Sequence, residues 1–373
     1  MLTRAAILRE SPGKFEIVDL ELDAPRQGEL QVKLAASGLC HSDDHYQAGE
    51  TPLNHYPMVC GHEGAGVVEA VGPNTPGWAV GDHVVFSFLP TCGRCRWCAE
   101  GMTHLCDLGA FTLTGSRFDD PGSFRCSLGG EPVGQLCGIG TFAERTVVSA
   151  NSAIKIAHDL PMDKVCLLGC SVGTGWGSAV YAADVAPGDV VIVMGTGGVG
   201  IHAVQGAAHA GATAVVAADP VAFKRETAEQ VGATHSFASI GEADEFAKSI
   251  TDGHGADKVI VTVGVLTGEH IAQAFAAVRK GGTVVVTAIG DVEATVGIPV
   301  SAFELTVMQK RLQGALFGQC NPASDIPRQI RMYRAGQLKL DELVTRTYRL
   351  DEVVKAYEDM HAGHNIRGVI VFD

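Results

Sequence analysis

Four cysteines follow one another at short intervals in the segment TCGRCRWCAEGMTHLC, spaced C-x2-C-x2-C-x7-C: Cys92, Cys95, Cys98 and Cys106. Four thiolates this close can surround one tetrahedral metal ion, and zinc is the ion that such a set usually holds. A closed shell of four thiolates leaves no coordination position open, so this zinc would stabilise structure and perform no chemistry. The cluster therefore prompts a search for a second, open metal site elsewhere in the chain.

The bulk properties favour a globular protein that handles small molecules. A length of 373 residues suggests about two domains, and a hydrophobic share of 46% permits a large core. We expect a cytoplasmic protein, because the N-terminal segment shows no signal peptide and no apolar run is long enough to span a membrane. In such a location the eleven cysteines indicate reduced thiols and metal ligands. A net charge of −14 disfavours nucleic acid and anionic membranes as partners.

The pattern of residue types along the chain changes near residue 172. Residues 1–150 are rich in Gly, Pro and short β-type runs, which is typical of an irregular β-rich domain. The part that follows alternates Ala-rich helical stretches with short apolar runs, namely VVIVM (190–194), TAVVAA (213–218), KVIVTV (258–263) and TVVVTAI (283–289).

Such alternation predicts βαβ units around a parallel sheet that is buried on both faces. It breaks at Asn321-Pro322, and the tail ends in another strand-like run, GVIVF (368–372). The sequence thus predicts an α/β fold: a doubly wound parallel sheet over residues 172–317, inserted into a β-rich domain of residues 1–171 plus 318–373.

A glycine fingerprint follows the first strand of the α/β part: Gly195-x-Gly197-x-x-Gly200, with Gly198 and Val199 inside it. In this context the first glycine makes a tight turn, the second lets a pyrophosphate approach the backbone, and the third lets the helix pack on the strand. The second strand ends in Asp219, whose carboxylate would accept hydrogen bonds from the adenosine ribose and repel a 2′-phosphate. The motif therefore predicts NAD as the cofactor, in preference to NADP.

Three separated segments contain candidate ligands for an open zinc site. They are GLCHSDDH with Cys40, GHEG with His62, and GC with Cys170. Two cysteines, one histidine and a water form a catalytic zinc shell of the alcohol dehydrogenase type. Each segment is a weak signal alone, but the dinucleotide motif and the four-cysteine cluster make their combination meaningful, and we expect two zinc ions per chain.

With these motifs in view, the chain resembles the zinc-dependent medium-chain alcohol dehydrogenases over nearly its whole length. The resemblance rests on GHEGAGVVEAVG, GDHV, the four-cysteine lobe, GTGGVG and the closing NIRGVIVF, in that order. Within that family the chain is similar to the actinobacterial NDMA-dependent alcohol dehydrogenases, through GLCHSDDH, CGRCRWC, TGWGSAVYAADV, GGVGIHAVQGAAHAGA, NPASDIPR and LKLDELVTR. The resemblance implies a Rossmann coenzyme domain inserted in a GroES-like catalytic domain.

The resemblance also implies a reaction. An alcohol bound to the catalytic zinc would give a hydride to NAD and leave as an aldehyde or ketone. Ser42 would take the proton of the alcohol and pass it towards His45 near solvent. Asp43 would hydrogen-bond His62, and Glu63 would approach the zinc from behind or stabilise its shell. The NDMA-dependent group is further expected to hold NAD(H) tightly and to pass electrons to a separate redox carrier.

Other positions of the family carry over to the cofactor site and the assembly. The family pattern places His41 and Arg367 at the pyrophosphate, Lys224 at the adenosine ribose, and Thr174 and Val199 at the nicotinamide. The long Gly-rich segment 107–140 is typical of dimeric members, so a homodimer is expected. Ser171 and Gly173 differ from the Gly and Thr of close relatives, with an effect that the resemblance does not define.

Two other functions compete with alcohol oxidation. A thiol-dependent formaldehyde dehydrogenase on the same fold would need cations at the pocket mouth, and Arg94, Arg96 and Arg117 are the candidates. A non-enzymatic zinc-ribbon protein would use the segment from Cys92 to Cys106 to bind nucleic acid or a protein. The negative net charge and the second zinc motif oppose the latter function.

Overall fold

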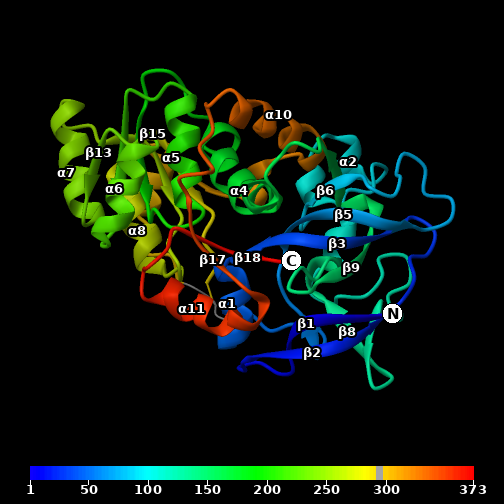
Figure 1. The fold of residues 1–373 in the computed structure, drawn as a ribbon. Helices are drawn as coiled ribbons and strands as arrows, with labels where there is room; N and C mark the ends of the chain where they lie inside the picture. The colour runs from blue at the N-terminus through cyan, green and yellow to red at the C-terminus, as the bar shows by residue number, and fades with distance from the viewer. Residues whose placement is uncertain (291–296) are drawn as a thin grey trace. The chain divides into compact units, whose positions relative to one another are not determined.

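The computed structural model describes residues 1–290 and 297–373, and the chain forms two compact units (Figure 1). The first unit contains residues 1–170, 321–335 and 340–373, and the second contains residues 171–320 and 336–339. The boundaries lie close to those expected, but the return of 336–339 to the second unit was not foreseen. Gln205 explains that return, because its side chain accepts from the backbone N–H of Lys339 at 2.7 Å and donates to the carbonyl of the same residue at 3.1 Å.

The first unit is built from β-strands, as the short β-type runs predicted. Five strands close into a barrel in the order β1-β2-β7-β8-β4; they are β1 (Leu2–Leu8), β2 (Phe15–Leu22), β7 (Cys126–Leu128), β8 (Glu131–Gln135) and β4 (Met58–Val59). A second sheet has the order β10-β6-β5-β3-β18-β17, with β9 also paired to β3; its strands are β10 (Ala153–Ile156), β6 (His83–Phe86), β5 (Glu63–Val71), β3 (Glu29–Gly38), β18 (Arg367–Val371), β17 (Val344–Tyr348) and β9 (Arg145–Ser149).

Strands from the two ends of the chain lie side by side in this second sheet. In Figure 1 the red β18 runs beside the blue β3, and Val369 pairs antiparallel with Gly38. Helices of this unit are α1 (His41–Ala48), α2 (Arg96–Ala99), α3 (Met162–Val165), α10 (Pro322–Arg334) and α11 (Val353–His361). The C-terminal segment thereby becomes a neighbour of the residues that follow β3, where the first candidate zinc ligand lies.

The second unit contains the predicted parallel sheet. All neighbouring strands in it are parallel, in the order β13-β12-β11-β14-β15-β16; they are β13 (His235–Phe237), β12 (Ala214–Ala218), β11 (Val190–Met194), β14 (Ala256–Val261), β15 (Val278–Val286) and β16 (Arg311–Gly314). Every residue of β11 and β12 is buried, as expected when helices cover both faces of a sheet. This is the doubly wound order of dinucleotide-binding folds.

The helices of this unit are α4 (Ser171–Gly177), α5 (Gly200–His209), α6 (Ala222–Gln230), α7 (Ile240–Ile250), α8 (Gly268–Ala277) and α9 (Ala302–Thr306). The strand order reverses at β11: β12 and β13 lie on one side of β11 in the sheet, and β14, β15 and β16 lie on the other side. Ligands of open α/β sheets bind outside the carboxyl ends of the strands at such a switch point. The glycine fingerprint begins at Gly195, directly after β11, and so occupies that position.

No single helix among the described residues is both long and apolar enough to cross a membrane. One bent pair, Met162–Gly169 with Ser171–Ala182, passes on length and composition alone.

Candidate active site

Four buried side chains of the first unit converge into a possible metal-binding group: Cys40, His62, Glu63 and Cys170. Their candidate ligand atoms all lie within 4.8 Å of one another. Cys40 precedes α1 in extended conformation, His62 and Glu63 stand at the start of β5, and Cys170 follows a 3₁₀ turn over Cys166–Gly169. Three segments that are distant in sequence therefore meet at one point inside the unit.

The imidazole of His62 is oriented by a carboxylate behind it. Asp43 Oδ2 lies 3.0 Å from His62 Nδ1, and Asp43 Oδ1 accepts a 2.7 Å hydrogen bond from the backbone N–H of Gly61. Asp43 is fully buried, so its position is fixed by these contacts. A carboxylate on Nδ1 leaves Nε2 as the nitrogen available to a metal, which is the usual arrangement of metal-bound histidines.

Glu63 is held by a buried cation. Its carboxylate forms an ion pair with the guanidinium of Arg367, whose Nη2 also donates to the carbonyl of Leu39 at 2.9 Å. The side chains of Glu63 and Arg367 are 0% and 2% exposed. The structure therefore places Arg367 behind the candidate metal group, and its contact with a pyrophosphate stays a prediction.

The side chains of this candidate metal group shift one another's pKa values. A hydrogen bond with Cys170 holds the pKa of Cys40 well below its ordinary value, and the same bond together with burial raises the pKa of Cys170. Burial opposes the charged form of His62, yet Asp43 and the two sulfurs raise its pKa well above the usual value. A divalent cation would replace these shared protons and satisfy the sulfurs and the imidazole together. Two sulfurs, a nitrogen and a carboxylate in a buried site fit zinc.

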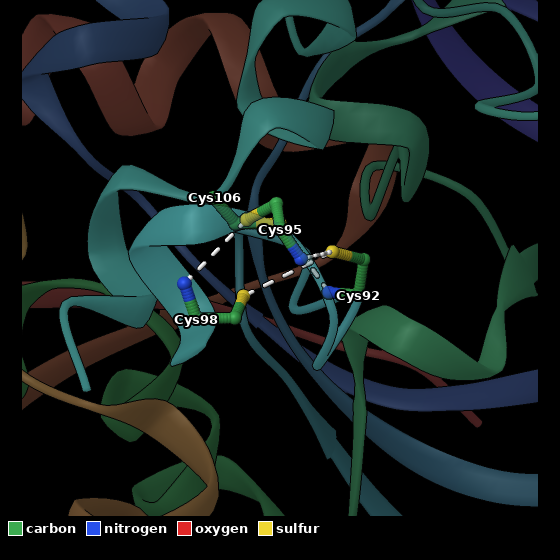
Figure 2. Close-up of side chains that lie close together, drawn as sticks. All are labelled: Cys92, Cys95, Cys98 and Cys106. Carbon is green, nitrogen blue, oxygen red and sulfur yellow. Dashed lines mark hydrogen bonds between the residues drawn. The ribbon is translucent and has the colours of Figure 1, made fainter. Parts of the chain in front are cut away.

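The four cysteines of the second candidate metal site lie together in one lobe of the first unit (Figure 2). All four thiols are free of disulfides. Zinc–sulfur bonds of about 2.3 Å in a tetrahedron place sulfurs about 3.8 Å apart, and the sulfurs of Cys92 and Cys98 are 3.9 Å apart. The spacing of the sulfurs therefore fits the expected four-thiolate zinc site.

Backbone N–H groups already point at these sulfurs, as the dashed lines in Figure 2 show. The N–H of Cys92 lies 3.3 Å from Cys106 Sγ, and that of Cys95 lies 3.3 Å from Cys92 Sγ. N–H groups of Asp107 and Cys98 lower the pKa of Cys95 to about 6. These N–H groups thus favour the thiolate of Cys95, the form that binds a metal, whereas burial raises the pKa of Cys98 and Cys106.

The glycine fingerprint of the second unit has the three expected geometries. Gly195 has a φ of +89°, in the region that favours glycine, and a Cβ on Gly200 would collide with the carbonyl of Gly195. A Cβ on Gly197 would meet only Lys224 Nζ, at 3.9 Å. The space over Gly197 is therefore open to a ligand, and the ammonium of Lys224 stands beside it. This arrangement fits a dinucleotide pyrophosphate.

Asp219 stands where the second strand ends, and it braces the fingerprint loop. Its Oδ2 accepts from the N–H of Thr196 at 2.8 Å and its Oδ1 from the N–H of Val221 at 2.9 Å. Each carboxylate oxygen retains a second lone pair for a ribose hydroxyl. Arg225 is turned away from the carboxylate, since its Nη1 donates to the carbonyls of Asp219 and Pro220.

One supporting residue of this loop was not predicted. Thr262, directly after β14, donates its hydroxyl to the carbonyl of Gly195 at 2.6 Å, and so fixes the turn from the neighbouring strand. Thr174 in α4 and Val199 before α5 are both partly exposed. A Cβ on Gly173 would lie 2.7 Å from Cε2 of Phe317, so this glycine makes room for an aromatic ring.

The predicted proton-handling residues lie on α1. Ser42 Oγ is 3.7 Å from Cys40 Sγ, which places the hydroxyl beside the candidate metal group, and His41 is exposed. The expectation that His45 stands near solvent is wrong, because its side chain is only 5% exposed. Its Nδ1 hydrogen-bonds to Glu50, a residue that the sequence did not single out.

Comparison with known proteins places this architecture in a family. The family model for the alcohol dehydrogenase GroES-like domain matches residues 26–158, and that for zinc-binding dehydrogenases matches residues 198–334. The NDMA-dependent alcohol dehydrogenase of Amycolatopsis methanolica is 49% identical over 371 residues, covering 100% of this chain and 99% of the relative. This chain belongs to the family of zinc-binding medium-chain alcohol dehydrogenases. The family and the fold class expected from the sequence are thereby confirmed.

Other alcohol dehydrogenases agree in sequence and in structure. The class-3 alcohol dehydrogenase of Drosophila melanogaster is 34% identical, covering 99% of this chain and 97% of the relative. The crystal structure of benzyl alcohol dehydrogenase from Acinetobacter calcoaceticus has a TM-score of 0.91 at 29% identity, and each chain is covered to 100%. An alcohol dehydrogenase zinc-binding domain protein from Burkholderia ambifaria has a TM-score of 0.92 at 30% identity, covering 100% of this chain and 99% of the other.

Proposed function

We propose that this alcohol dehydrogenase oxidises an alcohol to an aldehyde or ketone by transferring a hydride to NAD at a zinc-containing site. The observation that carries the proposal is the buried convergence of Cys40, His62, Glu63 and Cys170. Two cysteines and one histidine leave the fourth position of a tetrahedral zinc open to an alcohol. Zinc bound there would act as a Lewis acid that lowers the pKa of the alcohol, and bound NAD would accept the hydride.

The residues of the chain have separate tasks in this reaction. Cys40, His62 and Cys170 hold the metal, with Asp43 keeping the imidazole of His62 in place. Glu63 and Arg367 form a neutral buried pair behind the ligands. Ser42, beside Cys40, is the hydroxyl that takes the proton of the alcohol. The long fingerprint loop and Asp219 bind the dinucleotide, with Lys224 adding a positive charge beside the open space over Gly197.

Asp219 supports NAD in preference to NADP. Its carboxylate is held in place by two backbone N–H groups, so it would meet a 2′-phosphate as a fixed negative charge. The nearest arginine in sequence, Arg225, is occupied by backbone carbonyls. A fixed anion at this position discriminates against a phosphate.

We further propose that NAD(H) stays bound between turnovers and is reoxidised by a separate redox carrier. This finer proposal rests on the 49% identity to a relative whose activity is named for NDMA. Denaturing the purified protein and measuring what it releases tests both parts. We expect two zinc ions and one NAD(H) per chain, and turnover with NDMA as the acceptor without added NAD.

Other outcomes of that measurement are equally definite. Zinc without cofactor would contradict tight binding and favour an ordinary exchanging dehydrogenase. Release of NADP(H), identified by mass spectrometry, would contradict the role given to Asp219. Zinc at only one ion per chain would contradict the presence of two metal sites.

The alternative function, a thiol-dependent formaldehyde dehydrogenase, requires cations at the pocket mouth, and one of the three candidate arginines is not available for that role. Arg117 is only 1% exposed, and it pairs with Glu29 and Asp23 inside the first unit. Its expected place at a pocket mouth is therefore wrong, because two carboxylates bury it instead. Arg96 is bound to Glu100 and lies over the ring of Trp97.

We propose that the protein forms a homodimer through the last strand of the parallel sheet. β16 pairs only with β15 among the described strands, and nearby large apolar side chains are exposed, with Phe303 at 60% and Val307 at 62%. An edge strand beside exposed apolar groups is suited to pairing with a second copy. Sedimentation equilibrium should give twice the 39.0 kDa chain mass; a mass of one chain would contradict the dimer.

A further inference from the structure

The end of α1 brings two titratable side chains together just beyond the candidate metal group. The helix ends at Gly49, whose φ of 85° lies in the left-handed region. Backbone N–H groups of Glu50 and Thr51 then donate to the carbonyl of His45 at 3.0 and 3.3 Å. This reversal returns Glu50 to the side of His45, and its carboxylate hydrogen-bonds to Nδ1 of the ring.

The hydrogen bond determines which nitrogen of His45 can act as a base. A carboxylate only accepts hydrogen bonds, so Nδ1 carries the proton and Nε2 keeps its lone pair. The His45 side chain is 5% exposed whereas that of Glu50 is 39% exposed. A protonated, buried imidazole would therefore have its charge balanced by a carboxylate at the surface.

We propose that Glu50 is a positioning residue for the proton-accepting step: it holds the ring of His45 with Nε2 available for the proton, and its carboxylate pairs with the imidazolium that forms. The proposal rests on the proposed alcohol oxidation, which must dispose of one proton per alcohol. In that step the O–H bond of the alcohol breaks, Ser42 takes its proton and passes one proton on, and this proton bonds to Nε2 of neutral His45 while the Nδ1–H bond is kept. The product is an imidazolium paired with the Glu50 carboxylate. A third group that orients and stabilises a histidine base is a recurring device of enzyme sites.

Other titratable groups lie near the pair, and one of them provides the control variant. The ring of His41, on the same helix, is 5.9 Å from that of His45. His361 of α11 lies 6.4 Å from His41 and is bound through Nε2 to Asp44 at 2.7 Å. Asp44 is thus a second carboxylate of the same cluster that serves a different histidine. Asp44→Asn removes an equal charge and leaves the bond between Glu50 and His45 in place.

The test compares Glu50→Gln with Asp44→Asn and the native holoenzyme. Trifluoroethanol, which binds as an alcohol without being oxidised, is mixed with each protein, and proton release is followed with a pH indicator. The glutamine keeps the shape and still accepts from Nδ1, but it lacks the charge. We expect proton release and alcohol turnover to slow by about 10-fold, because the imidazolium formed on His45 would no longer be paired with a carboxylate.

Further readouts separate this role from a merely structural one. Zinc and NAD(H) content should stay at the native level in Glu50→Gln, and Glu50→Asp should restore most of the rate. Native proton release in Glu50→Gln would overturn the proposal, as would an equal effect of Asp44→Asn. A native protein that releases no proton would also overturn it. A native holoenzyme that releases the proton but oxidises no alcohol would instead refute the proposed function and leave the Glu50 comparison valid.

Discussion

Replacing Cys40 with serine is expected to lower the zinc content from two ions per chain to one and to slow alcohol oxidation by at least about 1,000-fold. Cys40 is one of three sulfur or nitrogen ligands in its site, together with His62 and Cys170. The hydroxyl of serine is a much weaker zinc ligand than a thiolate. The side chain lies after β3, in a loop anchored by the hydrogen bond from Arg367 to Leu39. The fold should therefore survive the exchange.

Cys126→Ser is the matched control for this prediction. Cys126 is also a buried thiol of the first unit, 6% exposed in β7 of the barrel, and it belongs to neither metal-binding group. Burial raises its pKa to about 12, so it is a neutral thiol without a metal-binding task. Inductively coupled plasma mass spectrometry gives zinc per chain, and steady-state kinetics gives the rate. Two zinc ions and a native rate in Cys40→Ser would refute the assignment of the catalytic site.

Replacing Cys95 with serine should instead cost stability. We expect the free energy of unfolding to fall by about 4 kcal/mol or more, because metal binding and folding of the lobe are coupled. The lobe has little apolar cohesion of its own, since α2 contains no buried residue. Its four sulfurs lie close together and accept from backbone N–H groups of the lobe (Figure 2). Without zinc, neighbouring thiolates would repel one another.

Thermal unfolding with and without a chelator measures this effect, and zinc content shows which site was lost. The catalytic ligands Cys40, His62 and Cys170 lie in other segments, so one zinc per chain should remain. The Cys126→Ser control again reports the cost of a hydroxyl at a cysteine position. A variant that keeps two zinc ions and the native melting temperature would show that Cys95 is not a metal ligand.

Parts of the candidate site could be predicted from sequence because their contacts are local. The four cysteines of the lobe are close in sequence, so their spacing alone limits them to one centre. The glycines at 195, 197 and 200 follow a strand and open a helix, and each has the geometry that its place in the motif predicts. The parallel sheet was predictable for a similar reason, since strands buried on both faces must be continuous apolar runs.

The catalytic group needed more than local pattern. Cys40, His62 and Cys170 could be combined into one predicted zinc site only through a family resemblance, because a single Cys or His residue is a weak indication of a metal ligand. Contacts across the chain were out of reach: Arg367 pairs with Glu63, 304 residues away in sequence. Arg117 looked like a surface cation, but Glu29 lies close enough in the fold to bury it.

The pairing of Glu50 with His45 could not be predicted from the sequence either, although the two residues are close in the chain. A left-handed glycine at position 49 and two N–H bonds to one carbonyl turn the chain back, and neither can be read from residue types with certainty. By itself, the sequence predicted zinc as the metal and determined the dinucleotide fold, through spacing and periodicity, and it indicated the family through the resemblance of its motifs. The tertiary structure decided which charges are buried together and which carboxylate pairs with His45, because burial and charge pairing depend on segments that only the folded chain brings into contact.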